Sequence, residues 1–122
     1  FYAALSFTFH NRSPEGHDST AVVKELQSRY SAYPYVEGTH FHTSFGHLEG
    51  YSALYYTYMW SLVIARDLFA RFTGDQLMNT ELAVRYRKAI LEPGGEKDAR
   101  DLVRAFLDRD YNFDAYQRWM EE

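Results

Sequence analysis

The side chains best suited to chemistry in this sequence are one histidine and three tyrosines in a single stretch. They are His47, Tyr51, Tyr55 and Tyr58. The spacing of the three tyrosines places them on one face of a helix. Phenol groups that line a wet cleft can donate hydrogen bonds to a developing oxyanion without carrying a charge. The alternative is packing, because aromatic side chains at helical spacing are more often part of a core.

Two glycines flank the histidine, Gly46 before it and Gly50 after it. Glycine is used where the backbone must bend or approach another group closely. A mobile turn that presents the imidazole of His47 beside phenols suits closure on a substrate, so both glycines are candidate substrate-binding positions. The alternative is a loop before a helix, in which His47 only caps the helix.

One long central helix is predicted to position these residues. Within the stretch Phe45–Phe72, more than twenty residues follow the glycine-bracketed turn without Pro or Gly, and the helix is expected to end near Thr73–Gly74. Its side chains are apolar nearly all round, which predicts a buried helix. The uncharged run from Gly50 to Ala65 is too short to span a bilayer, which needs roughly 20 apolar residues.

The other elements are also predicted to be helices, which makes the fold class all-α. Five to six helices are expected around the central one, in a single helical domain over residues 1–122. Tyr35–Ser44 has no helical period and is expected to be a loop. A first helix is expected at Phe1–His10. A second is expected to begin at Asp18 or Ser19, to point Tyr30 inward and to stop before Tyr33-Pro34. The others are expected from Asn79 or Thr80 to Pro93, at Glu96–Leu107, and after Asn112.

Composition limits the classes of function. The net charge of −4 and the absence of a Lys/Arg cluster argue against a nucleic-acid partner. No segment suggests a membrane partner. The chain has no cysteine, which fits a cytoplasmic protein, and no signal peptide is visible. Phe1 begins in the middle of an apolar pattern, so we expect a piece of a longer chain.

The five histidines do not form a recognisable metal motif. No H-E-x-x-H sequence is present, so no zinc site of that kind is predicted in this chain. His40 and His42 would lie on one side of an extended segment and form a weak ligand pair. The alternative is two loop histidines that hydrogen-bond to backbone or water.

Several motifs in order resemble the thimet oligopeptidase family of zinc metallopeptidases, with neurolysin, the peptidyl-dipeptidases and oligopeptidase A. The first motifs are Phe45-Gly46-His47-Leu48, Gly50-Tyr51 and Tyr55-Tyr56-Thr57-Tyr58-Met59-Trp60-Ser61. The later ones are Tyr86-Arg87, Ile90-Leu91, Pro93-Gly94-Gly95, Asp98 and Phe106-Leu107-x-Arg109. The resemblance extends over roughly Phe1 to Met120 and is strongest from Phe45 onward.

The resemblance implies a role for each candidate residue. His47, Tyr51 and Tyr58 would contact the substrate carbonyl or the tetrahedral intermediate, and Tyr55 would line the same cleft. Zinc would be a cofactor of the full-length enzyme, held by residues upstream of this region, and none is expected to be bound here. The chain would be the C-terminal part of the catalytic region of a longer oligopeptidase that hydrolyses short peptides.

Two expectations concern the chain on its own. It should be inactive without the missing N-terminal part of its own chain, and it should self-associate through apolar surface that this part normally covers. The alternative function is a helical interaction module with an aromatic binding face and no catalysis.

Overall fold

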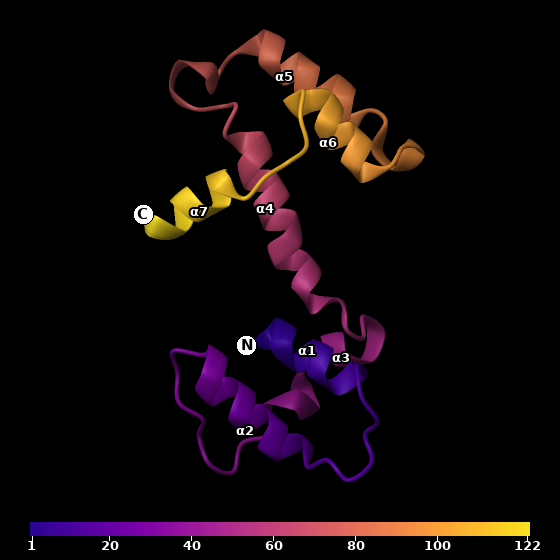
Figure 1. The fold of residues 1–122 in the computed structure, drawn as a ribbon, viewed down its shortest axis with the longest axis vertical. Coiled ribbons are helices and arrows are strands. Elements are labelled where there is room, and N and C mark those ends of the chain that lie inside the picture. The colour runs from indigo at the N-terminus through magenta and orange to yellow at the C-terminus, as the bar shows by residue number, and fades with distance from the viewer. The chain divides into compact units, whose positions relative to one another are not determined.

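The computed structural model describes residues 1–122 and consists of helices and their connections, without strands (Figure 1). The predicted all-α fold class is therefore confirmed, with seven α-helices where five to six were expected. The chain forms two compact units, Phe1–Tyr58 and Met59–Glu122. That residues 1–122 act together as the C-terminal part of one catalytic region stays a prediction.

The first unit is built on two helices that pack through a small apolar core. Leu5 of α1 is fully buried against Val22, Val23 and Leu26 of α2. Tyr30, which we expected to point inward, is 50% exposed, because the apolar stripe of α2 ends one turn earlier. The elements of this unit are α1 (Tyr2–His10), α2 (Ser19–Tyr30), the 3₁₀ helix η1 (Phe41–Ser44), α3 (His47–Gly50) and the 3₁₀ helix η2 (Leu54–Tyr56).

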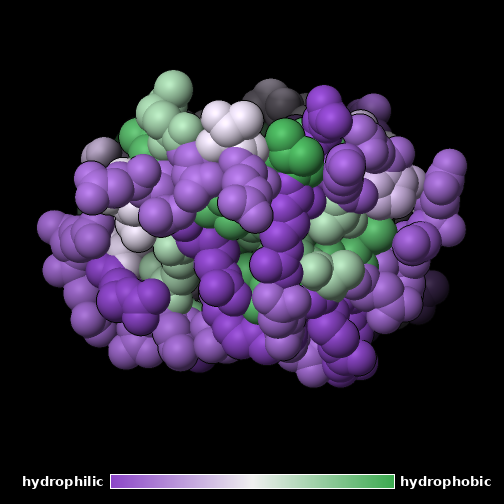
Figure 2. Space-filling view, turned by 90° about the horizontal axis from the view of Figure 1, so that it is seen from above, coloured by the Kyte–Doolittle hydropathy of each residue, from purple (hydrophilic) through white to green (hydrophobic).

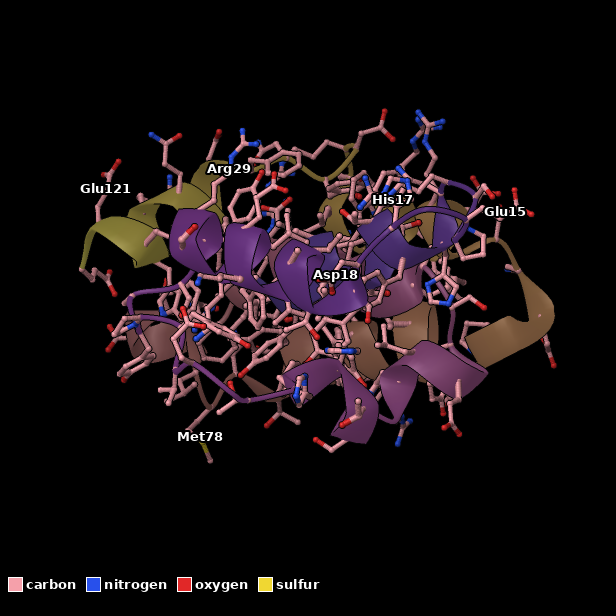
Figure 3. All side chains as sticks on the ribbon, turned by 90° about the horizontal axis from the view of Figure 1, so that it is seen from below. Glu15, His17, Asp18, Arg29, Met78 and Glu121 are labelled. Carbon is pink, nitrogen blue, oxygen red and sulfur yellow. The ribbon has the colours of Figure 1, made fainter.

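The start of α2 follows the sequence prediction. The carboxylate of Asp18 accepts hydrogen bonds from the backbone N–H groups of Thr20 and Ala21, at 2.9 and 3.2 Å. These bonds satisfy donors that the first turn of a helix leaves unpaired. Figure 3 shows Asp18 and Arg29 near opposite ends of the helix.

The second unit is organised around α6. Val103, Phe106 and Leu107 are buried, and side chains of α4 and of the α5 region pack against them. The space-filling view shows apolar side chains in gaps of a mainly hydrophilic face (Figure 2). The elements are α4 (Thr57–Phe69), η3 (Gly74–Gln76), α5 (Thr80–Tyr86), the π-helical turn η4 (Arg87–Leu91), η5 (Gly94–Glu96), α6 (Ala99–Leu107) and α7 (Asp114–Glu121). No helix in the structure has the length and apolar character needed to cross a membrane.

The long central helix is shorter and more exposed than predicted. Ser52 has a φ of 46°, in the left-handed region, so the helix cannot run through this position. Helix α4 starts at Thr57 and is 13 residues long. Its only buried residues are Val63 and Asp67, because the cluster around α6 covers one face of α4. The prediction of a fully buried helix is wrong for this chain.

A buried carboxylate joins α4 to the segment after α6. Asp67 is 2% exposed and accepts two hydrogen bonds from the guanidinium of Arg109, at 2.6 and 2.7 Å, and one from the backbone N–H of Asn112, at 3.0 Å. Burial alone raises the pKa of Asp67. The hydrogen bonds from Arg109 and Asn112 and the charges of Arg109 and Arg71 together outweigh it, so this pKa lies below its usual value.

Candidate functional site

The four predicted site residues lie on two short helices of the first unit, on the turn between them and at the start of α4. His47 opens α3, Tyr51 directly follows α3, Tyr55 lies in η2, and Tyr58 is the second residue of α4. The N–H of Tyr51 donates to the carbonyl of His47 at 3.1 Å, and the N–H of Leu54 donates to the carbonyl of Tyr51 at 3.0 Å. The local backbone is thus a chain of tight turns, where one continuous helix was expected.

This chain of turns brings the imidazole of His47 among all three phenol rings. Its ring centroid lies 5.4 Å from that of Tyr51, 5.1 Å from that of Tyr55 and 5.9 Å from that of Tyr58. Nε2 of His47 lies 3.1 Å from the hydroxyl oxygen of Tyr58, within hydrogen-bond distance. The structure therefore places the predicted catalytic residues together, in one compact unit.

The His47–Tyr58 contact leaves hydrogen-bonding capacity for another molecule. A phenol hydroxyl can donate one hydrogen bond and accept others. When Nε2–H of His47 donates to the hydroxyl oxygen, the O–H of Tyr58 is available to donate elsewhere. Tyr58 is 59% exposed and Tyr51 is 62% exposed, so both rings are accessible. Two adjacent neutral donors of this kind suit a carbonyl oxygen that gains negative charge.

Tyr55 is held differently from the other two tyrosines. Its ring lies against Phe45, with centroids 5.1 Å apart, and against Tyr2, at 5.7 Å. The side chain is half-buried in this aromatic cluster. Such packing suits a residue that lines a cleft and supports its neighbours.

The two glycines adopt helical geometry, and the mobile turn we expected is the short helix α3. Gly46 has φ −57° and ψ −23°, and Gly50 is the last residue of α3. A Cβ atom built at either position would meet nothing within 4 Å. Nothing within residues 1–122 therefore requires glycine there, and the space beside each is open to another molecule.

His40 and His42, the weak metal-ligand pair, both contact hydroxyl groups of α2. His40 Nδ1 lies 3.1 Å from the hydroxyl of Thr20, and His42 Nε2 lies 3.0 Å from the hydroxyl of Ser19. His42 is in the 3₁₀ helix η1, so the segment is neither extended nor a plain loop. No three His, Asp or Glu side chains of residues 1–122 form a group that could hold a metal ion. Residues 1–122 therefore offer no ligand set of their own for the zinc that the resemblance implies.

Two side chains that contact the backbone of the site were not predicted from the sequence. Ser6 and His10 of α1 contact the carbonyl groups of Ser52 and Leu48. Their spacing of one helical turn shows that they share a face of α1. Only the tertiary structure shows what that face contacts.

Comparison with known protein families identifies the family of this chain. Residues 1–122 match the profile of peptidase family M3. The chain belongs to this peptidase family.

The curated relatives give a consistent picture. A mitochondrial intermediate peptidase of Schizophyllum commune is 36% identical over 107 residues, which is 86% of this chain and 14% of the relative. The Homo sapiens mitochondrial intermediate peptidase is 31% identical over 109 residues, 89% of this chain and 15% of the relative. The chain thus spans about one seventh of the length of the relatives it matches. The expected cytoplasmic location is wrong, since these relatives are named as mitochondrial proteins.

Proposed function

We propose that this chain supplies the carbonyl-binding part of the active site of a mitochondrial metallopeptidase. The observation that carries the proposal is the contact between His47 Nε2 and the hydroxyl of Tyr58, at 3.1 Å. Membership of peptidase family M3 makes a peptide the expected substrate class. The exposed rings of Tyr51 and Tyr58 make the cluster accessible to it.

The role of these residues follows from the charge changes in peptide hydrolysis. When water adds to a peptide bond, the carbonyl oxygen gains negative charge. Tyr51 and Tyr58 would donate hydrogen bonds to this oxygen, His47 would donate to the hydroxyl of Tyr58, and these bonds would strengthen as the charge develops. Tyr55 would hold the cluster in place, and Gly46 and Gly50 would leave room for the peptide backbone.

The activated water must come from elsewhere in a longer peptidase. Zinc is the cofactor that the family resemblance implies, and it would supply a water of lowered pKa. We expect residues 1–122 alone neither to bind zinc tightly nor to hydrolyse peptides. Metal-dependent cleavage of a quenched peptide by the purified 122-residue chain would contradict this.

The proposal is tested in a chimaeric peptidase, defined as the Homo sapiens relative with residues 1–122 in place of the segment that they match. Tyr58→Phe removes one hydroxyl and keeps the ring. We expect kcat and kcat/KM to fall together by about 10²–10³, with KM little changed, because the hydroxyl acts in the transition state.

The matched control is Tyr56→Phe. Tyr56 is a neighbouring tyrosine of η2 that is 49% exposed and lies outside the ring–ring contacts of the cluster. Its variant should keep normal kinetics. If Tyr58→Phe also keeps near-normal kcat/KM, Tyr58 does not bind the oxyanion.

A second candidate function is an interaction module without catalysis. It is favoured by the large apolar side chains that this chain exposes, among them Trp60 at 50%, Met59 at 47% and Leu54 at 52%. On this hypothesis Tyr58→Phe changes nothing, whereas Trp60→Ala abolishes association with a partner.

Either function predicts that the 122-residue chain self-associates. A monodisperse monomer at high concentration in sedimentation would count against that prediction.

A further inference from the structure

Two side chains of α1 hydrogen-bond to the backbone that carries the candidate site. The hydroxyl of Ser6 donates to the carbonyl of Ser52 at 2.6 Å, and Nε2 of His10 lies 3.2 Å from the carbonyl of Leu48. Ser6 and His10 are four residues apart, which is about one turn of α1. Leu48 directly follows His47, and Ser52 directly follows Tyr51. Each contact is therefore one residue away from a site residue.

The segment that they contact is poorly determined by its own local interactions. Helix α3 has only four residues, too few to be stable in isolation. Ser52 has a φ of 46°, a left-handed conformation that a residue with a side chain rarely adopts without support. The positions of His47 and Tyr51 thus depend on contacts from outside the segment.

The geometry of Ser6 indicates a specific role. A serine in a helix commonly turns its hydroxyl back to a carbonyl of the preceding turn. Ser6 is fully buried, yet its hydroxyl reaches the carbonyl of Ser52, 46 positions away in the sequence. Its bond therefore holds the one residue of this segment that is in a strained conformation.

The ring of His10 contacts its own helix as well as the segment that carries the site. Its Nδ1 lies 2.7 Å from the carbonyl of Ser6, and its Nε2 faces the carbonyl of Leu48. Both partners are carbonyl oxygens, which only accept, so the ring nitrogen that carries a proton donates to the carbonyl that it faces. The imidazole thereby links the last turn of α1 to α3.

We propose that Ser6 and His10 are positioning residues that hold α3 and the turn after it, so that His47 meets Tyr58. The inference rests on the proposed function for its purpose, because it assigns no contact with substrate to either residue. It requires that loss of either side chain separates His47 from Tyr58 while the core of α1 and α2 stays folded.

The test uses the 122-residue chain and nuclear magnetic resonance of two probes, the ring nitrogens of His47 and the backbone of Ser52. In His10→Ala and Ser6→Ala, we expect the ring nitrogens of His47 to lose the chemical shifts that the hydrogen bond with Tyr58 produces. In Ser6→Ala, the Ser52 couplings should also leave the values of a left-handed residue. Methyl signals of Val23 and Leu26 report whether the core persists. His10 is exposed, so its removal spares the core even if Ser6→Ala unfolds the unit.

Two control variants are matched to these changes. Ser28→Ala removes a hydroxyl that donates only to the nearby carbonyl of Glu25, and His17→Ala removes an exposed loop histidine. Neither should alter the signals of His47 or Ser52.

A rescue distinguishes positioning from loss of packing. Glycine adopts positive φ freely, so Ser52→Gly should restore the His47–Tyr58 signature in the Ser6→Ala background. Ser52→Gly cannot refill a space that Ser6→Ala leaves in the core. Unchanged His47 signals in both single variants would overturn the proposal, and so would a loss that Ser52→Gly fails to restore.

The kinetic consequence is measured in the chimaeric peptidase. His10→Ala should lower kcat/KM by about tenfold to a hundredfold, as small misplacements of catalytic groups do, without lowering the melting temperature. The failures are distinguishable. If Tyr58→Phe leaves kcat/KM unchanged, the proposed function is refuted and the positioning result stands. If the resonance signals of His47 and Ser52 stay unaltered in the variants, only the positioning role is refuted.

Discussion

In the second unit the carboxylate of Asp67 is 2% exposed and its oxygens accept three hydrogen bonds, two from Arg109 and one from Asn112. In the first unit, Tyr58 shares one hydrogen bond with His47 although 59% of it is exposed. Both are polar contacts between residues distant in sequence. They differ in how much hydrogen-bonding capacity remains unused.

The difference separates a structural site from a candidate functional one. A buried polar group must be fully paired, since an unpaired one is costly. A group that binds a substrate must instead keep a donor accessible until the substrate arrives. Asp67 meets the first condition, whereas Tyr51 and Tyr58 meet the second.

Asp67→Ala should destabilise the second unit by about 3–5 kcal/mol, because it leaves Arg109 without its bidentate partner and opens a buried space. Both tryptophans, Trp60 and Trp119, belong to this unit. Tryptophan fluorescence in a denaturant titration therefore measures the effect. Asp110→Asn is the control, because Asp110 is 49% exposed and should lose about 1 kcal/mol or less. Equal losses for both variants would show that the buried Asp67 stabilises the unit no more than an exposed carboxylate does.

His47→Ala and Tyr58→Phe in the chimaeric peptidase should each lower kcat/KM by about 10² or more. Because His47 and Tyr58 contact each other and serve the same substrate oxygen, the double variant should cost less than the two single effects combined. Far-UV circular dichroism should show intact helices in all three variants. Additive effects would mean that the two residues act at separate places.

The sequence predicted those parts of the fold that local chemistry determines. Asp18 and Asn79 cap α2 and α5 as expected. The side chain of Asn112 accepts from the N–H of Asp114, but Phe113 and not Asn112 directly precedes α7. The apolar spacing of α6 agrees with its buried side chains, Leu102, Val103, Phe106 and Leu107, although Ala99 at the start of the helix is exposed. These signals lie within one or two turns of chain, where spacing and capping chemistry are informative.

The break before α4 could not be predicted in the same way. Ser52 is held at positive φ in a segment that Ser6 contacts from α1, and no local pattern indicates a contact across 46 positions. The periodicity correctly grouped Tyr55 and Tyr58, whose ring centroids are 5.1 Å apart. It gave no geometric reason for His47 to meet Tyr58, because eleven positions separate them.

Acid should weaken the second unit through Asp67. Its pKa is lower in the folded chain than in the unfolded one, so the unfolded chain takes up the proton first as the pH falls. Its contribution to the unfolding free energy is complete above the unfolded pKa of about 4 and is lost as the pH falls through the folded value. The difference in fluorescence-detected stability between wild type and Asp67→Asn should therefore shrink below about pH 4. A constant difference would show that the charge of Asp67 does not stabilise the fold.

Tyr55→Phe should have a smaller effect than Tyr58→Phe. Tyr55 keeps its ring contacts with Phe45 and Tyr2 when the hydroxyl is removed. We therefore expect KM of the chimaeric peptidase to rise by a small factor and kcat to stay near normal. A fall in kcat as large as that of Tyr58→Phe would assign the oxyanion contact to Tyr55 as well.

Gly46→Ala is expected to have the smallest effect on stability. It tests whether a position that is neutral for folding is needed for function. Gly46 has helical φ and ψ angles, and a new Cβ would meet nothing within 4 Å. The 122-residue chain should therefore fold at least as well, with a gain of up to about 0.5–1 kcal/mol from the reduced freedom of the unfolded chain. If the open space admits a peptide backbone, the same methyl group should raise KM or lower kcat/KM in the chimaeric peptidase. Gly95→Ala is the matched control, because its Cβ also meets open space but it belongs to the second unit. A Gly46→Ala enzyme with unchanged kinetics would remove Gly46 from the substrate-binding surface and leave the site to His47 and the tyrosines.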